Sequence, residues 1–219
     1  MPKRVGLVHA LQDSMEPVAD AMRRLWPAAE FAHLFDGSLY LDRSRGSAPP
    51  DEIDRRVGEL LRYCASTGVD GILFTGSFFG EAVRKARATL LVPVLTSYDG
   101  IVEAALAKGT RFRVLATAAD SVGLLQADLE QAAAARGIDA QVDGHFVPDA
   151  MEALLGGDRE RHDELVAAAA AVQPACDAIL LAQFSMAPAG ALAAKRSGQV
   201  VLTAPEAGVL ELKRRLEDG

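Results

Sequence analysis

Cysteine is nearly absent from this 219-residue chain, which contains only Cys64 and Cys176. The two lie far apart in the sequence and lack the spacing of metal ligands, so neither a disulfide framework nor a zinc site is expected. We therefore expect no bound metal and a reducing, cytoplasmic location.

Long hydrophobic stretches and runs of basic residues are also missing. The apolar run Val5–Leu11 is interrupted by His9, which makes it too short for a signal peptide or a membrane span and more typical of a buried strand. The formal net charge is −7, and no Lys/Arg run appears, which disfavours a nucleic-acid partner. No glycine-rich phosphate loop follows the first strand, which argues against nucleotide binding. We expect no nucleic acid and no membrane, and homo-oligomer formation is left open.

Short apolar runs alternate with longer Ala- and Leu-rich amphipathic segments, and this alternation predicts a parallel α/β architecture. Strands are expected at Arg4–His9, Glu30–Leu34, Gly71–Thr75, Val92–Thr96, Phe112–Thr117, Ala140–Phe146, Ala178–Ala182 and Val200–Thr203. Helices are expected at Ser14–Leu25, Asp51–Thr67, Phe79–Ala88, Gly100–Lys108, Asp120–Arg136, Arg159–Val172, Pro188–Lys195 and Glu206–Leu216. The stretch from Arg43 to Pro50 is expected to be a loop. Ligands of this fold class bind at the carboxyl ends of the strands.

An internal repeat organises the chain. Three separate strand-loop units match at a constant offset of 107 residues: Asp70–Leu73 with Asp177–Leu180, Val94–Thr96 with Val201–Thr203, and Arg4 with Arg111. A constant register predicts two duplicated halves, residues 1–97 with a C-terminal helix near 204–219, and residues 98–203. If the halves pack about a pseudo-twofold axis, Gly76 lies opposite Gln183, and a small-molecule site lies in the cleft between the halves.

These features resemble the aspartate/glutamate racemase superfamily, which includes amino-acid and hydantoin racemases, maleate isomerase and arylmalonate decarboxylase. The resemblance is carried by Val5–His9, Asp70–Gly80, Pro93–Asp99, Val114–Thr117 and Asp177–Met186. It implies an α/β fold of two pseudo-symmetric halves, each a parallel sheet flanked by helices. It also implies a cofactor-independent racemase, isomerase or lyase, without pyridoxal phosphate, that acts on a small carboxylic acid or related carbonyl compound.

The chain departs from the family pattern at two decisive positions. The family places a cysteine after each of the two equivalent strands, where one thiolate removes the α-proton and the other thiol returns one. Here these positions hold Gly76 and Gln183, whereas Cys64 falls in an expected helix and Cys176 precedes a strand. The resemblance therefore predicts either an enzyme that works without the two thiols or a non-catalytic relative that binds a small acid as a sensor or carrier.

Hydroxyl and glycine residues in the strand-end loops are the candidates for ligand binding. Free amides and hydroxyls can hold a carboxylate there, which assigns substrate binding to Thr75, Gly76, Ser77, Thr117 and Ser185.

The catalytic roles are assigned to His9 and Gln183. His9 ends the first strand and titrates near neutrality, although a hydrogen-bonded structural histidine is the alternative. Gln183 cannot shuttle protons, but its amide can bind a carboxylate or carbonyl. Tyr98, Asp99, His145 and Glu206 are the other candidate proton donors or bases, and for Asp99 and Glu206 helix capping is an alternative role. His162, in a charged helical stretch, is expected to be solvated.

Overall fold

The computed structural model describes residues 1–218, which divide into two compact units. Unit 1 comprises Met1–Gly100 together with the chain from Gly208 onwards, and unit 2 comprises Ile101–Ala207. Each unit is built on one four-stranded parallel sheet, and the strand orders β2-β1-β3-β4 and β6-β5-β7-β8 are equivalent. The expected α/β class, with helix-flanked parallel sheets in two similar halves, is therefore confirmed.

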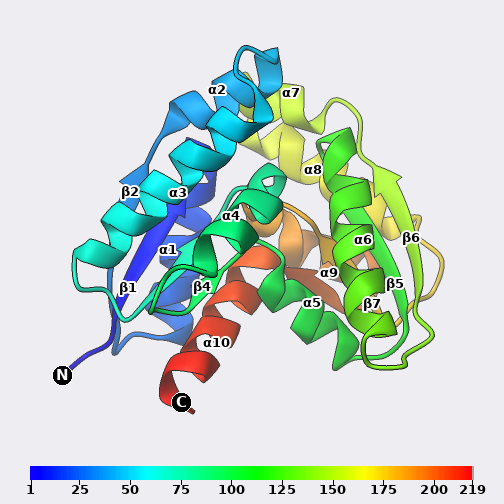
Figure 1. The fold of residues 1–219 in the computed structure, drawn as a ribbon. Helices are drawn as coiled ribbons and strands as arrows, with labels where there is room; N and C mark the ends of the chain where they lie inside the picture. Colours follow the sequence, from blue (N-terminus) through cyan, green and yellow to red (C-terminus); the bar gives the residue numbers. More distant parts are fainter. Residues whose placement is uncertain (219) are drawn as a thin grey trace. The chain divides into compact units, whose positions relative to one another are not determined.

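The elements of unit 1 alternate between strand and helix (Figure 1). They are β1 (Arg4–His9), the 3-10 turn η1 (Gln12–Ser14), α1 (Met15–Leu25), β2 (Glu30–Phe35), α2 (Gly37–Arg45), α3 (Pro50–Ser66), β3 (Gly71–Phe74), the 3-10 turn η2 (Ser77–Phe79), α4 (Gly80–Arg87) and β4 (Val94–Leu95). Helix α10 (Ala204–Glu217) begins in unit 2 and supplies the C-terminal part of unit 1.

Unit 2 repeats this alternation. After α5 (Asp99–Leu106), its elements are β5 (Arg111–Ala116), α6 (Ala119–Ala134), β6 (Gln141–Phe146), α7 (Ala150–Leu155), α8 (Arg159–Ala171), β7 (Ala178–Leu181), the 3-10 segment η3 (Phe184–Ala189), α9 (Gly190–Ser197) and β8 (Val201–Thr203).

The core of unit 1 lies on both faces of its sheet because the central strands are apolar at nearly every position. Val8 and Phe74 belong to a cluster with Val57 and Leu61 of α3. On the opposite face, a Cβ atom at Gly71 would meet Leu212 and Leu216 of α10. Helix α10 therefore anchors the end of the chain on the sheet of unit 1.

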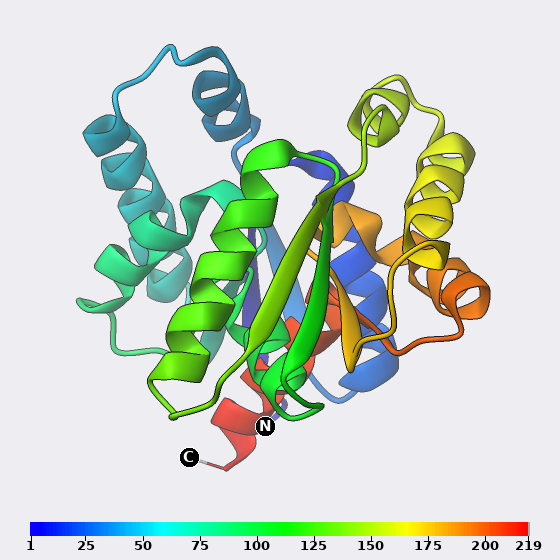
Figure 2. The same cartoon turned by 90° about the vertical axis from the view of Figure 1, so that its right-hand side faces the viewer.

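The sheet of unit 2 is likewise covered on both sides, with α6 over one face and α8 and α9 over the other (Figure 2). Leu115, Ile179 and Leu181 pack with Val166 of α8. On the α6 side, the Val122 side chain occupies the space that a Cβ atom at residue 144 would take, so Gly144 allows this helix to pack against the sheet. The carboxyl ends of β5 and β7 lie at the same edge of the sheet because the two strands are parallel neighbours.

Two helices were not expected from the sequence. Helix α2 runs through Arg45, so the expected loop begins only at Gly46, and α7 occupies Ala150–Leu155. Asp36 caps α2 by accepting a bond from the Ser38 amide at 2.9 Å, and Gly46 ends the helix with φ 62°. These end signals, rather than an apolar stripe, define the helix.

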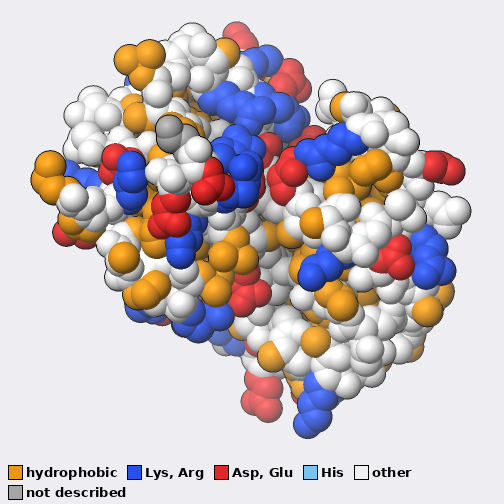
Figure 3. Space-filling model, turned by 90° about the horizontal axis from the view of Figure 1, so that it is seen from below, with side chains coloured by type: hydrophobic (Ala, Val, Ile, Leu, Met, Phe, Trp, Pro, Cys, Tyr) orange, Lys and Arg blue, Asp and Glu red, His pale blue; other side chains and the backbone are white. Residues whose placement is uncertain are grey.

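The surface carries charged side chains of both signs, as the face in Figure 3 shows. Many form ion pairs within one unit, such as Lys85 with Asp54 and Glu81. Within residues 1–218, none of the helices is long and apolar enough to cross a membrane.

Candidate functional site

His9 lies at the end of β1 and is fully buried. Its Nδ1 is 2.9 Å from the Thr75 hydroxyl and its Nε2 is 2.8 Å from Nδ1 of His33, so both ring nitrogens have partners. Burial, followed by the neighbouring His33, lowers the pKa of His9 to about 3. The imidazole is therefore neutral at physiological pH and forms the middle of a chain from His33 to Thr75.

His33 joins the site although no sequence pattern indicates it. It lies on the edge strand β2, and its partner in the strand register is Leu7. Because side chains alternate along a strand, Leu7, His9 and His33 share one face of the sheet. This pairing of strands distant in sequence has no local sequence signal.

Thr75 follows β3 and is buried. Its amide donates to the Val8 carbonyl at 2.9 Å, and its hydroxyl is bonded to His9. The expected binding loop, Thr75-Gly76-Ser77, is thus fixed to β1 by its first residue, and only Gly76 and Ser77 enter the turn that follows.

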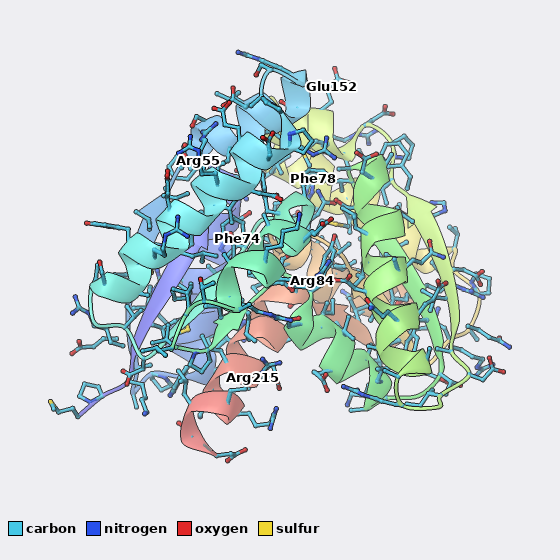
Figure 4. All side chains as sticks on the ribbon, in the orientation of Figure 1. Arg55, Phe74, Phe78, Arg84, Glu152 and Arg215 are labelled. Carbon is cyan, nitrogen blue, oxygen red and sulfur yellow. The ribbon has the colours of Figure 1, made fainter. Side chains whose placement is uncertain are left out.

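Gly76, the first of the two positions where the family pattern has a cysteine, has no room for a side chain. A Cβ atom there would lie 2.7 Å from the Phe79 ring and 2.8 Å from the Phe74 ring. Phe74 and Phe78, which precede and follow Gly76 in the chain, are labelled in Figure 4. The rings of Phe74 and Phe79 therefore occupy the space that a thiol-bearing side chain at residue 76 would need.

A pocket of about 760 Å³ lies in unit 1 beside the same aromatic residues. Phe78, Phe79 and Ile53 line it, and the Arg43 guanidinium lies 5.5 Å from the centroid of the Phe78 ring. Phe78 and Phe79 thus form the apolar wall that follows the expected binding loop.

Gln183, at the second cysteine position, is buried and is hydrogen-bonded by Thr117. The Thr117 amide donates to Gln183 Oε1 at 2.6 Å and the Thr117 hydroxyl is 3.1 Å from the same oxygen. Because Oε1 accepts these bonds, the Gln183 NH₂ group is the part available to an oxygen of a ligand.

Ser185 lies two residues further along, in η3, and is 1% exposed. Its hydroxyl oxygen is buried and has no hydrogen-bond partner. Thr117, Gln183 and Ser185 are therefore gathered at the carboxyl ends of β5 and β7, as the sequence predicted for unit 2, but only the first two are bonded to each other.

Neither cysteine lies at a strand end. Cys64 is buried in α3, where its sulfur fills the space beside Gly6, and burial raises its pKa to about 11. Cys176 precedes β7, its thiol lies 3.3 Å from Gln199 Oε1, and burial raises its pKa as well. Both thiols are therefore weak nucleophiles.

The acidic candidates Asp99 and Glu206 lie in the first turns of α5 and α10. Asp99 Oδ2 accepts from the Thr96 amide at 2.8 Å and Thr96 Oγ1 accepts from the Asp99 amide at 3.1 Å, which is a reciprocal capping box. Thr203 donates to Glu206 at the equivalent place in unit 2.

The remaining histidines differ from each other. His145 is exposed on β6, whereas His162 is fully buried in α8, so the expectation that it is solvated is wrong. Among residues 1–218, no group of three or more His, Cys, Asp or Glu side chains is arranged to hold a metal ion.

Solved structures with the same fold include racemases and an arylmalonate decarboxylase. Glutamate racemase RacE1 from Bacillus anthracis matches 99% of this chain and 82% of its own, with 16% identity and a TM-score of 0.75. Allantoin racemase from Pseudomonas fluorescens matches 99% and 92%, with 18% identity and a TM-score of 0.70. An arylmalonate decarboxylase matches 99% and 93%, with 19% identity and a TM-score of 0.67.

Sequence comparison gives the family directly. No curated protein sequence matches the chain, but the model of the Asp/Glu/hydantoin racemase family matches residues 14–212. The match spans nearly the whole chain, including the ends of β3, β5 and β7. This chain therefore belongs to the Asp/Glu/hydantoin racemase family.

Proposed function

We propose that the protein is a cofactor-independent enzyme of racemase, isomerase or lyase type that acts on a small carboxylic acid or related carbonyl compound without catalytic thiols. Family membership supports the general class of reaction. The single observation that carries the proposal is that neither strand-end position, residue 76 or residue 183, holds a thiol. The rings of Phe74 and Phe79 fill the space beside Gly76, and Gln183 presents an amide group at the second position.

The ligand contacts are proposed on the same loops. In unit 1, Gly76 and Ser77 follow a strand end fixed by Thr75, and their backbone amides together with the Ser77 hydroxyl are the proposed donors to a carboxylate. In unit 2, the Gln183 NH₂ group donates to a ligand oxygen, with Thr117 keeping it in that orientation and Ser185 close in the chain. A charge-assisted hydrogen bond contributes about 1.5–3 kcal/mol, so losing one donor weakens binding roughly ten- to a hundredfold.

Hydrogen exchange at carbon tests this function. The protein is incubated in D₂O with a panel of amino acids and small dicarboxylic acids, and deuterium at the α-carbon is followed by NMR together with decarboxylation. We expect exchange or turnover of at least one acid. The binding contacts are tested by calorimetry: Ser77→Ala and Gln183→Ala should weaken binding of that acid, and unchanged affinity in both would refute the assignment.

A second function is supported by His9. Its neutral state and its two occupied ring nitrogens remove the expected proton donor of β1. We therefore keep a non-catalytic small-acid sensor or carrier as the alternative. Binding of an acid from the panel without α-deuteration or turnover would favour this alternative over the enzyme.

A further inference from the structure

A chain of hydrogen bonds connects an exposed histidine to the strand-end loop of unit 1. His33 is exposed on the edge strand β2, whereas His9 is fully buried and Thr75 is 3% exposed. Nδ1 of His33 lies 2.8 Å from Nε2 of His9, and Nδ1 of His9 lies 2.9 Å from Oγ1 of Thr75. The side chains of three neighbouring strand positions therefore form one continuous path that ends at the first residue of the loop.

The equivalent positions of unit 2 carry no polar side chain. They hold Ala116 in place of His9, Ala182 in place of Thr75 and Gly144 in place of His33. The first two correspondences follow from the offset of 107, and the third follows from the register of β1 with β2 and of β5 with β6. Because unit 2 forms the same sheet with these smaller residues, the fold itself does not require the hydrogen-bonded chain.

The middle residue couples the two hydrogen bonds. Within residues 1–218, the side-chain partners of His9 are an imidazole and a hydroxyl, and neither carries a negative charge to balance a protonated ring. His9 is therefore neutral, and a neutral imidazole has one N–H donor and one acceptor nitrogen. If Nε2 accepts from His33, Nδ1 donates to Thr75. If Nε2 donates to His33, Nδ1 accepts from Thr75.

The direction of the chain decides what the Thr75 hydroxyl offers to a ligand. A hydroxyl has one proton to donate. When Nδ1 of His9 donates to Oγ1, the Thr75 proton remains for another acceptor. When Thr75 donates to Nδ1, its proton is used within the chain, and its oxygen presents lone pairs, which repel a carboxylate.

Protonation of His33 permits one direction alone. A charged imidazole carries a proton on both nitrogens and cannot accept a hydrogen bond, so Nδ1 of charged His33 donates to His9 and the Thr75 proton is released. The charged groups that act on His33 are Glu16 and Arg23 of α1, which pair with each other at 3.0 Å. Partial burial lowers the pKa of His33, Glu16 raises it, and Arg23 lowers it.

We propose that His33 is a positioning residue of the strand-end loop: through His9 it sets the direction in which the Thr75 hydroxyl donates, and so controls binding of an anionic ligand. A carboxylate only accepts hydrogen bonds, so it is favoured by the direction that charged His33 imposes. Acids therefore bind more tightly as the pH falls through the titration of His33. The ligand part of the proposal rests on the proposed function, whereas the coupling of the three side chains does not.

The first test needs no ligand. The ring nitrogens of the full-length, ¹⁵N-histidine-labelled protein are followed by NMR from pH 8 to pH 4.5, with His9→Gln and His33→Gln used to assign the resonances. We expect His9 to change from the Nε2–H form to the Nδ1–H form with the midpoint at which His33 titrates, below pH 6.5. A His9 tautomer that stays the same while His33 titrates would overturn the coupling.

The second test is calorimetry at pH 5 and pH 8 with the acids of the panel that stay ionised in this range, such as aspartate, whose side-chain pKa is about 3.9. We expect roughly tenfold tighter binding at pH 5, the effect of one added charge-assisted donor. His33→Gln and Thr75→Val should bind with nearly equal affinity at both pH values, and Thr75→Ser should restore the difference because it restores the hydroxyl.

A direct effect of the His33 charge on the ligand is distinguished by Thr75→Val, which keeps that charge and removes the hydroxyl. Persistence of the full pH dependence in Thr75→Val would overturn the relay. The matched control is Thr89→Val, because the exposed Thr89 donates to the Ala86 carbonyl at 2.9 Å, away from the loop. This control should keep the wild-type pH dependence.

The two proposals fail separately. Acids that bind the wild type with the same affinity at pH 5 and pH 8 would overturn the role of His33 alone. A protein that binds no acid of the panel at either pH would overturn the proposed function, and the tautomer change of His9 would still decide whether the three side chains are coupled.

Discussion

At the scale of the residue, Gly76 is constrained by the rings of Phe74 and Phe79. Gly76→Ala should lower the free energy of unfolding by about 1–3 kcal/mol because one ring must move. The matched control is Gly123→Ala in α6, where a Cβ atom would meet nothing within 4 Å. This control should gain about 0.4–1 kcal/mol. Urea unfolding of both variants checks the difference, and equal effects at the two positions would contradict the crowding.

Because the pKa of His9 is lowered in the folded protein, the free energy of unfolding depends on pH. The folded-state pKa of about 3 lies below the ordinary value of 6.5. Below pH 6.5 the unfolded chain therefore binds a proton that the folded chain does not, and stability falls by about 1.4 kcal/mol per pH unit towards pH 3. Above pH 6.5 this stabilising contribution is fully present.

The measurement is chemical unfolding of the wild type and His9→Gln between pH 7 and pH 4. The wild type should show the steeper loss of stability, and the variant a flatter profile. Parallel profiles would mean that His9 is protonated in the folded protein.

The positions of the candidate residues were more predictable than their bonds. A strand followed by a polar loop locates Thr75 and Gln183 at the ends of β3 and β7. The His9–His33 bond depends on the register of β1 and β2, and the burial of His162 depends on how α8 packs, so neither could be inferred from neighbouring residues.

At the scale of the element, α10 contributes a buried side chain to unit 1 from the far end of the chain. Leu212 is fully buried, whereas Leu210 on the same helix is 51% exposed. Leu212→Ala should destabilise the protein by about 2–5 kcal/mol, because it leaves a cavity near Gly71. Leu210→Ala should change stability by less than about 0.5 kcal/mol. Thermal unfolding distinguishes the two, and similar Tm values would show that α10 is not packed as described.

Elements with strong periodic or apolar patterns were predicted well, and short ones were not. All eight expected strands are present. The central strands β3 and β7 are apolar and buried at every position, whereas the edge strands β2 and β6 are largely exposed. Helices α2 and α7 escaped prediction: α2 has a weak apolar stripe and only Leu39 buried, and α7 has only six residues. Such short helices depend on caps and tertiary contacts more than on pattern.

At the scale of the whole molecule, the two units repeat one strand order and one set of anchoring bonds. Asp70 accepts from the Arg4 amide, and Asp177 accepts from the Arg111 amide at the same offset of 107. This repetition is what an internal duplication predicts, and it explains why self-comparison of the sequence was informative. The repeat departs from itself at Gly76 and Gln183, and these are the positions where the proposed function places ligand contacts.

The central claim is that this member of the racemase family works without thiols, and a cysteine-free variant tests it most directly. Cys64→Ala/Cys176→Ser removes both sulfurs, which lie in α3 and before β7. The rate of α-deuterium incorporation is measured for the acid that the wild type accepts, with folding checked by circular dichroism. We predict the wild-type rate. Loss of exchange in a folded cysteine-free protein would contradict the account.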